Sequence, residues 1–275
     1  MNDPLPTMPP ADVFTLHRGS APLLVSLPHD GTEIPETIAT RMTPEALSVP
    51  DTDWHVGKLY AFARGTGASV IAPRWSRYVV DLNRPPDGHA LYPGRSETGL
   101  VPFSTFAERP IYRAGTPDAR EIAARVETYW LPYHSALQRE LQRLRGIHGR
   151  VVLWDGHSIK SRVPMFFDGQ LPDFNLGTAN GSSCSPALQQ RLTRVLDHLA
   201  GPPSSEYSHV VDGRFKGGYI TRHYGNPEQG VDAVQLELAQ CTYMDEESFE
   251  YQPGPAAGVQ RVIRALIEAC LTGAG

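Results

Sequence analysis

The sequence predicts a three-layer α/β sandwich built around a mostly parallel mixed sheet. Short runs of apolar, β-branched residues alternate along the chain with longer segments whose apolar positions recur at helical spacing. This is the order expected of parallel strands joined by crossover helices. Neither an internal repeat nor a shift in composition divides the chain, and its 275 residues are 40% hydrophobic and 20% charged. We therefore expect a single domain over residues 1–275 with a sizeable core.

The first third of the chain is expected to hold a loose tail, four strands and one helix. Residues 1–11 carry four prolines and form the tail. Residues 13–27 predict two strands around a glycine-containing turn, the second of them buried from Leu23 to Leu27. Helical spacing of apolar residues predicts a helix from Asp53 to Arg64, with Asp53 as its cap or first-turn acid. The β-branched runs "ASVIAP" and "RYVVDLN" follow as short strands.

The rest of the chain begins with a long irregular segment. Residues 85–116 are rich in proline and glycine without sustained periodicity, which is typical of a functional loop. A helix over 118–145 follows, which Pro132 should kink or divide, and then a strand over 151–154. Two amphipathic helices come later, one ending near Leu199 and one running from Val259 to Cys270. Between them lie the glycine-rich turns "HVVDG" and "GGYITRHYG" and the apolar run "AVQLELA".

Four of the apolar runs end in side chains capable of chemistry. These residues are His29 and Asp30, Asn83 and Arg84, Asp155 and His157, and Glu237. In open α/β sheets the ligand site lies beyond the carboxyl ends of the strands. We therefore expect these side chains to converge on one crevice.

Two neutral imidazoles and a carboxylate form the three-ligand site of a catalytic zinc, whose fourth position stays open. His29 and His157 are the candidate imidazoles, although both could instead be hydrogen-bonded histidines that orient loops. The residues leave the carboxylate open between Asp53, Glu33 and Asp155. Asp155 has a second interpretation, as a hydrogen-bond acceptor that orients His157.

Glu237 shares one strand face with Gln235 in an otherwise apolar run, which indicates either a buried general base or a solvated strand face. Arg84, directly after Asn83, has the forked guanidinium suited to a substrate carboxylate, and Arg222 in "TRHYG" is a second candidate. Surface ion pairs are the alternative for both arginines. The basic "GRFKGG" segment lacks the residue order of a phosphate-binding loop.

Composition excludes several classes of function. A net charge of −5 with scattered Lys and Arg gives no basic field for nucleic acid, and no apolar run approaches the length of a membrane helix. Three isolated cysteines indicate neither a disulfide framework nor a thiolate zinc site. The N-terminus lacks a basic start followed by an apolar core, so we expect a cytoplasmic protein.

Several motifs together resemble those of the N-formylglutamate amidohydrolase, or deformylase, family. They span nearly the whole chain and are "SLPHDGTEIP", "DTDWHVGKLY", "SRYVVDLNRPPDG", "LYPGRSETGLVP", "PYHSAL", "DGHSIKS", "LPDFNLGTANG", "GRFKGGYITRHYG" and "QLELAQCTYM". The family is similar in fold to zinc carboxypeptidases and acylamino-acid deacylases. This chain departs from the family pattern at Gly156, where Cys is frequent, and at Asp232, where His is common.

The resemblance implies hydrolysis of N-formyl-L-glutamate to formate and L-glutamate, a terminal step of histidine degradation. It implies His29, Asp53 and His157 as ligands of Zn²⁺, or of another divalent metal such as Co²⁺, and Glu237 as the acid/base. It implies Arg84 as a binder of substrate carboxylate, and we add Asn83 and Arg222 as further candidates. The alternatives are a related enzyme for another N-acyl amino acid, a non-catalytic dicarboxylate-binding protein, and a purely structural metal site.

Overall fold

The computed structural model describes residues 13–91, 94, 96–201 and 207–272, so the expected tail over 1–11 lies outside the described residues. Its centre is a seven-stranded sheet of order β1-β3-β2-β4-β7-β5-β6. The strands are β1 (Phe14–His17), β2 (Leu23–Ser26), β3 (Ser69–Pro73), β4 (Val151–Ile159), β5 (Phe174–Gly177), β6 (His209–Val211) and β7 (Val231–Ala239). The four central strands β3, β2, β4 and β7 are parallel, while β1 and β5 join them antiparallel. The expected mixed, mostly parallel sheet is confirmed.

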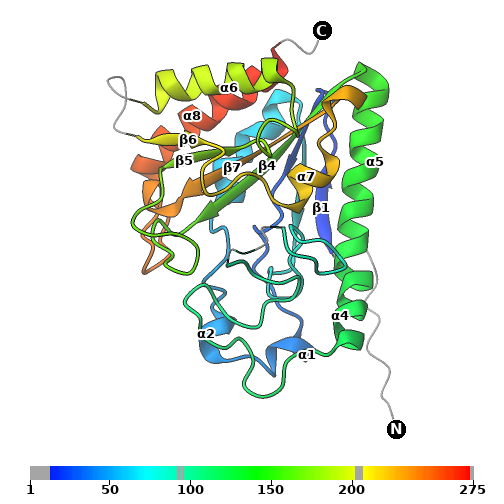
Figure 1. Cartoon of the computed structure of the whole chain (residues 1–275), viewed down its shortest axis with the longest axis vertical. Helices are drawn as coiled ribbons and strands as arrows, with labels where there is room; N and C mark the ends of the chain where they lie inside the picture. The colour runs from blue at the N-terminus through cyan, green and yellow to red at the C-terminus, as the bar shows by residue number, and fades with distance from the viewer. Residues whose placement is uncertain (1–12, 92–93, 95, 202–206, 273–275) are drawn as a thin grey trace.

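Helices cover both faces of this sheet and complete the expected three layers (Figure 1). On one face lie α3 (Val56–Leu59), α6 (Pro186–Leu199) and α8 (Pro253–Leu271). On the other face lie α5 (Leu131–His148) and α7 (Tyr219–Tyr224). Side chains alternate between the two layers along each strand, so Trp154 packs under α8 and Leu153 packs under α5.

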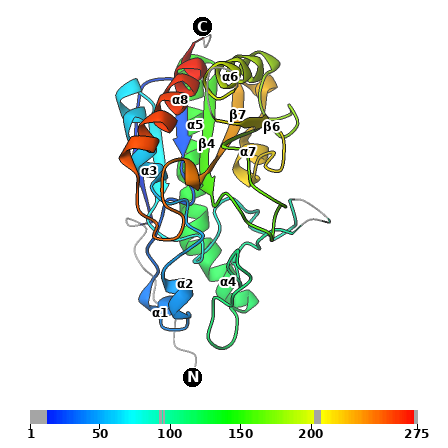
Figure 2. The same ribbon diagram turned by 90° about the vertical axis from the view of Figure 1, so that its left-hand side faces the viewer.

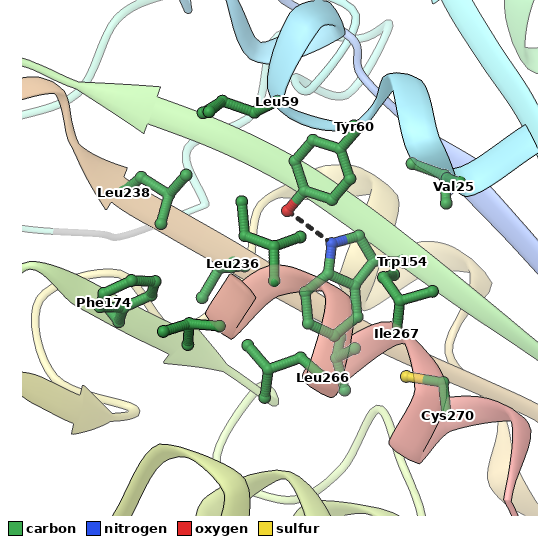
Figure 3. Close-up of a cluster of buried hydrophobic side chains, with 14 of the residues drawn as sticks. Val25, Leu59, Tyr60, Trp154, Phe174, Leu236, Leu238, Leu266, Ile267 and Cys270 are labelled. Atoms are coloured by element: carbon green, nitrogen blue, oxygen red, sulfur yellow. Dashed lines mark hydrogen bonds between the residues drawn. The ribbon is translucent and has the colours of Figure 1, made fainter. Parts of the chain in front are cut away.

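Trp154 lies at the centre of the first apolar layer and is fully buried. Its indole Nε1 donates a hydrogen bond of 2.8 Å to the hydroxyl of Tyr60, and its ring packs beside Leu266 and Ile267 of α8 (Figure 3). A buried indole is stable only when its N–H finds an acceptor. The bond therefore joins the short helix α3 to the central strand.

Loops and short helices gather beyond the carboxyl ends of the parallel strands (Figure 2). They include α1 (Glu36–Ala39), α2 (Pro44–Leu47) and α4 (Ala119–Arg125), and a separate apolar cluster around Met42, Tyr78 and Ile111 holds the loops together. Residues 85–116 form a loop without a helix or strand in their described part, as predicted. None of the described helices combines the length and apolarity that crossing a membrane requires.

The helix predicted over 118–145 is divided as expected. A π-helical turn, Val126–Trp130, follows α4, and α5 begins with Pro132 in its first turn. Because Pro132 cannot donate a backbone hydrogen bond, regular α-helical geometry is interrupted directly before it. The two later amphipathic helices are also confirmed as α6 and α8.

Several local predictions were wrong. The run "RYVVDLN" is a series of turns, because its apolar side chains are divided between two clusters instead of alternating across a sheet. The segment "GGYITRHYG" contains helix α7, and the helix predicted from Asp53 begins only at Val56 and tightens into a 3-10 helix at Ala61–Thr66. Strand β4 does not end at residue 154 but continues to Ile159, where it stays paired with β7.

The two N-terminal strands exist but do not pair with each other. Strand β3 lies between them and pairs antiparallel with β1 and parallel with β2. The prediction of "HVVDG" as a turn was also wrong, because it contains strand β6, and the four-residue strand β5 was not anticipated.

Candidate active site

Strands β4 and β7 carry polar residues toward their carboxyl ends, on the face covered by α5 and α7. On β4, Val151 and Leu153 pack against these helices, and Asp155 and His157 continue the same face toward the carboxyl end. On β7, Ala233 packs against these helices, and Gln235 and Glu237 follow it on the same face. His157 is the direct register partner of Glu237. The side-chain alternation predicted for "VQLEL" is therefore correct, and it brings the two strands' functional residues side by side.

His29, Asp53 and His157 meet at this edge of the sheet. One potential ligand atom of each lies within 4.8 Å of the others, and all three residues are buried. The Oδ2 atom of Asp53 is 2.8 Å from Nδ1 of His157 and 3.6 Å from Nδ1 of His29. Asp53 lies before α3 and is not its cap. The N-cap position, predicted for Asp53, is occupied by His55.

The two competing carboxylates have other partners or other positions than Asp53. Glu33 is half exposed and forms an ion pair of 2.8 Å with Arg74. Asp155 is fully buried beside the group, with its Oδ2 3.1 Å from Nε2 of His157, which is the orienting contact considered from the sequence. Among the candidates, Asp53 alone faces the Nδ1 atoms of both imidazoles.

Each imidazole is held from behind by a carboxylate. Nε2 of His29 donates to Oδ1 of Asp81 at 2.7 Å, and Nε2 of His157 lies 3.1 Å from Oδ2 of Asp155. Asp81 is fixed in turn by Arg77, whose Nη2 donates at 2.7 Å, and by the backbone N–H of Asn83 at 2.8 Å. Histidine ligands of metals usually have such carboxylate partners, which leave the other ring nitrogen for the ion. Two Nδ1 atoms and one carboxylate oxygen are a donor set that suits zinc.

The charges of the group also suit a divalent cation. Burial by itself would raise the pKa of Asp53, but the imidazoles of His29 and His157 lower this pKa far below its usual value. Burial likewise opposes ionisation of Asp81, yet His29 and Arg77 keep its pKa well below the usual range. Two ionised carboxylates, Asp53 and Asp81, thus contact the histidines, with Arg77 as their positive neighbour.

Glu237 faces the same space from β7 and is 6% exposed, so the solvated-face alternative is wrong. Burial raises the pKa of Glu237 to about 8, although His157 opposes the shift. Its Oε2 accepts a hydrogen bond of 3.0 Å from Gln235, whose own Oε1 accepts from the backbone N–H of Gly218 at 2.7 Å. Gly218 can approach because it has no side chain: a Cβ there would lie 2.3 Å from the Asn83 amide.

These groups line a cavity that opens to solvent. Arg84 lines it as predicted, and its guanidinium is positioned by Nε and Nη2 bonds to the carbonyl and hydroxyl of Thr98, at 2.8 and 3.1 Å. Asn83 also lines the cavity, but its amide is engaged with Asp155 and with the backbone N–H of Ile220. Arg222 lies on α7, where its Nε donates to the carbonyl of Gly217 at 2.8 Å, and it is not one of the described residues that line the cavity.

Sequence reasoning did not identify Arg77, Asp81 and Arg214 as residues of this site. A signal existed for Asp81, because a carboxylate inside the apolar run "VVDLNR" is costly unless it is paired. For Arg77 and Arg214 no pattern in the sequence distinguishes them from surface arginines.

The two departures from the family pattern lie away from the site. Asp232 is near the start of β7, opposite Val152, where it forms an ion pair of 3.0 Å with Arg150. Gly156 faces the other side of β4, where an added Cβ would meet Leu27 and the Tyr60 ring. Neither position changes the charge beside Glu237.

Comparison with known proteins gives a consistent result. A model of the N-formylglutamate amidohydrolase family matches residues 21–244. Two N-formylglutamate deformylases, from Pseudomonas putida and Pseudomonas aeruginosa, are 50% and 51% identical over 94% of this chain and 96% of their own length. The crystal structure of an N-formylglutamate amidohydrolase from Ralstonia eutropha JMP134 superposes with a TM-score of 0.78 at 27% identity, covering 95% of this chain and 97% of that one. A gene product of Agrobacterium tumefaciens shares the fold, with a TM-score of 0.72 at 18% identity over 96% of each chain.

Proposed function

From the membership of this chain in the N-formylglutamate amidohydrolase family, we propose that it hydrolyses N-formyl-L-glutamate to formate and L-glutamate with a bound zinc ion. Members of the family are amidohydrolases of linear amides, and this chain is one of them. We further propose that this reaction is a terminal step of histidine degradation. The observation that carries the metal assignment is the convergence of His29, Asp53 and His157 beside a buried Glu237.

In this proposal His29 and His157 supply their Nδ1 atoms, and Asp53 supplies Oδ2. Asp81 and Asp155 hold the rings so that these nitrogens stay aimed at one point. When bound, zinc supplies a Lewis acid that polarises the formyl carbonyl and acidifies water. A structural role for the ion is less compatible with a site that opens into a cavity.

Glu237 is the proposed proton carrier. Its carboxylate takes a proton from the attacking water and later gives it to the amine nitrogen of the departing glutamate. The Gln235 amide holds Oε2 of Glu237 and fixes the direction in which the carboxylate faces. A raised pKa suits this task, because a carboxyl group near neutrality can both accept and return a proton.

Arg84 is the proposed ligand of the substrate α-carboxylate. It directly follows Asn83, whose Nδ2 lies 3.0 Å from Nε2 of His157, so its guanidinium lies near the reacting centre. Asn83 contributes by holding Asp155 and the start of α7 in place. Arg222 supports the turn at Gly217 from the outside of the cavity.

The test is formate release from N-formyl-L-glutamate, measured beside acetate and succinate release from the matching N-acyl glutamates, together with the metal content of the protein. We expect formate to be released much faster than the other acids, by protein carrying about one zinc ion per chain. Faster release of acetate or succinate would show an enzyme for another acyl group. Metal-free protein that binds glutamate and turns over none of the three would show a binding protein.

A further inference from the structure

A third arginine, Arg214, lines the cavity and has no role in the proposed reaction. Arg214 lies in the segment between β6 and α7 and lines the cavity, as Arg77 and Arg84 do. Arg77 is engaged with Asp81 near the proposed metal. Arg214 instead contacts residues of the outer wall: Nε donates to the carbonyl of Phe166 at 2.7 Å and Nη2 to the carbonyl of Ser96 at 3.1 Å.

Arg84 and Arg214 both bind the segment 96–98. Arg84 binds Thr98, and Arg214 binds Ser96, two residues earlier. Two residues of extended chain span at most about 7 Å, so both guanidinium groups bind one short segment of the cavity wall. Glu97, between them, has Oε2 directed to the backbone N–H of Leu91 at 3.2 Å.

Two phenylalanine rings lie beside the guanidinium of Arg214. Its guanidinium carbon lies 5.6 Å from the ring centre of Phe166 and 5.4 Å from that of Phe215, and both phenylalanines line the cavity. Rings beside a cation displace water, which reduces screening and favours a charge-assisted bond to an anion. The planar group is also fixed by its two backbone acceptors before any ligand arrives.

The two arginines differ in their distance from the chemistry. Arg84 follows Asn83, which contacts His157, whereas the partners of Arg214 belong to the wall formed by residues 96, 166 and 215. A glutamate derivative has one carboxylate next to the amide and a second one four carbon–carbon bonds away, about 5 Å in an extended chain. Such a substrate requires one cation near the reacting amide and a second cation farther along the cavity, and Arg84 and Arg214 both line it.

We propose that Arg214 binds the side-chain carboxylate of the substrate and is the residue that selects an acidic side chain. The inference rests on the proposed function, since it names the group that recognises the distal half of an N-acyl dicarboxylic amino acid. Arg84 then binds the near carboxylate, and the pair excludes N-formyl amino acids with neutral side chains.

The test compares N-formyl-L-glutamate with N-formyl-L-glutamine, which has nearly the same shape without the distal charge. For the Arg214→Ala variant we expect kcat/KM for N-formylglutamate to fall about 30- to 100-fold, mainly through KM, because one charge-assisted hydrogen-bond pair is lost. The slower reaction with N-formylglutamine should change by less than about threefold. The preference for the acidic substrate therefore collapses. Arg214→Lys keeps the charge and should recover part of that preference.

Arg162→Ala is the matched control, because Arg162 is an exposed arginine of the neighbouring loop, bound to Gln170 and outside the cavity lining. It should leave the substrate preference unchanged. If Arg214→Ala lowers activity toward both substrates equally, Arg214 only supports the wall and the inference is wrong. If the wild-type protein releases no formate from N-formylglutamate, the proposed function itself has failed.

Discussion

Replacement of Glu237 by glutamine tests the proposed acid/base with little change of shape. The new amide has the same number of heavy atoms, and its oxygen can accept the hydrogen bond that Gln235 now donates to Oε2. The Nδ1 atoms of His29 and His157 and the carboxylate of Asp53 are untouched. The variant therefore removes proton transfer while leaving the proposed metal ligands intact.

We expect kcat for formate release to fall by a factor of about 10² to 10⁴, the usual contribution of a positioned general acid/base. Zinc content should stay at about one ion per chain, measured by elemental analysis on the same preparation. A variant that keeps more than about a tenth of wild-type turnover would show that another group carries the proton.

The same substitution should stabilise the metal-free protein at neutral and alkaline pH. Burial raises the pKa of Glu237 from 4.5 to about 8. Between these values the unfolded carboxyl group is ionised and the folded one keeps its proton, so the wild-type protein loses stability as the pH rises. At pH 7 the difference corresponds to at most about 3 kcal/mol, which the glutamine variant avoids.

Urea unfolding of chelator-treated protein measures this effect. The variant should be more stable than the wild type at pH 7 to 8. This difference in stability should disappear below about pH 4.5, where Glu237 is protonated in both the folded and the unfolded wild-type protein. Glu268→Gln, an exposed substitution on α8, serves as the control and should show no such trend. Equal stability of Glu237→Gln and wild type across this range would refute the claim that burial controls this carboxyl group.

Three further predictions concern the metal, the substrate and the core. Asp53→Ala should lower zinc content below about a tenth of an ion per chain while far-UV circular dichroism stays unchanged, whereas loss of folding would indicate a structural metal. Arg84→Ala should raise KM for N-formylglutamate about 30- to 100-fold with little change in kcat, and steady-state kinetics that show the reverse split would contradict carboxylate binding. Trp154→Phe should lower the free energy of unfolding by about 2–4 kcal/mol in urea, because it leaves a gap under α8 and removes the donor to Tyr60; a loss below about 1 kcal/mol would contradict this packing.

Several features followed from the sequence because they depend on local rules. Amphipathic spacing identified α6 and α8, and a proline without an N–H located the division before α5. Polar residues at the ends of apolar runs located His29, His157 and Glu237, because the carboxyl ends of parallel strands share one edge. The local errors arose where burial came from several directions, as in "RYVVDLN", whose side chains enter two clusters without forming a strand.

The sequence by itself determined the fold class, the family resemblance and the residue types available for chemistry. Only the tertiary structure decided which of these residues share one space. It brought the Asp53 carboxylate to both imidazoles and left Glu33 at the surface, and it placed Arg214 on the cavity wall while Arg222 lies outside the cavity lining. The physical reason is that a contact between residues distant in the chain depends on strand order, register and loop packing. The local sequence around a residue does not encode these properties.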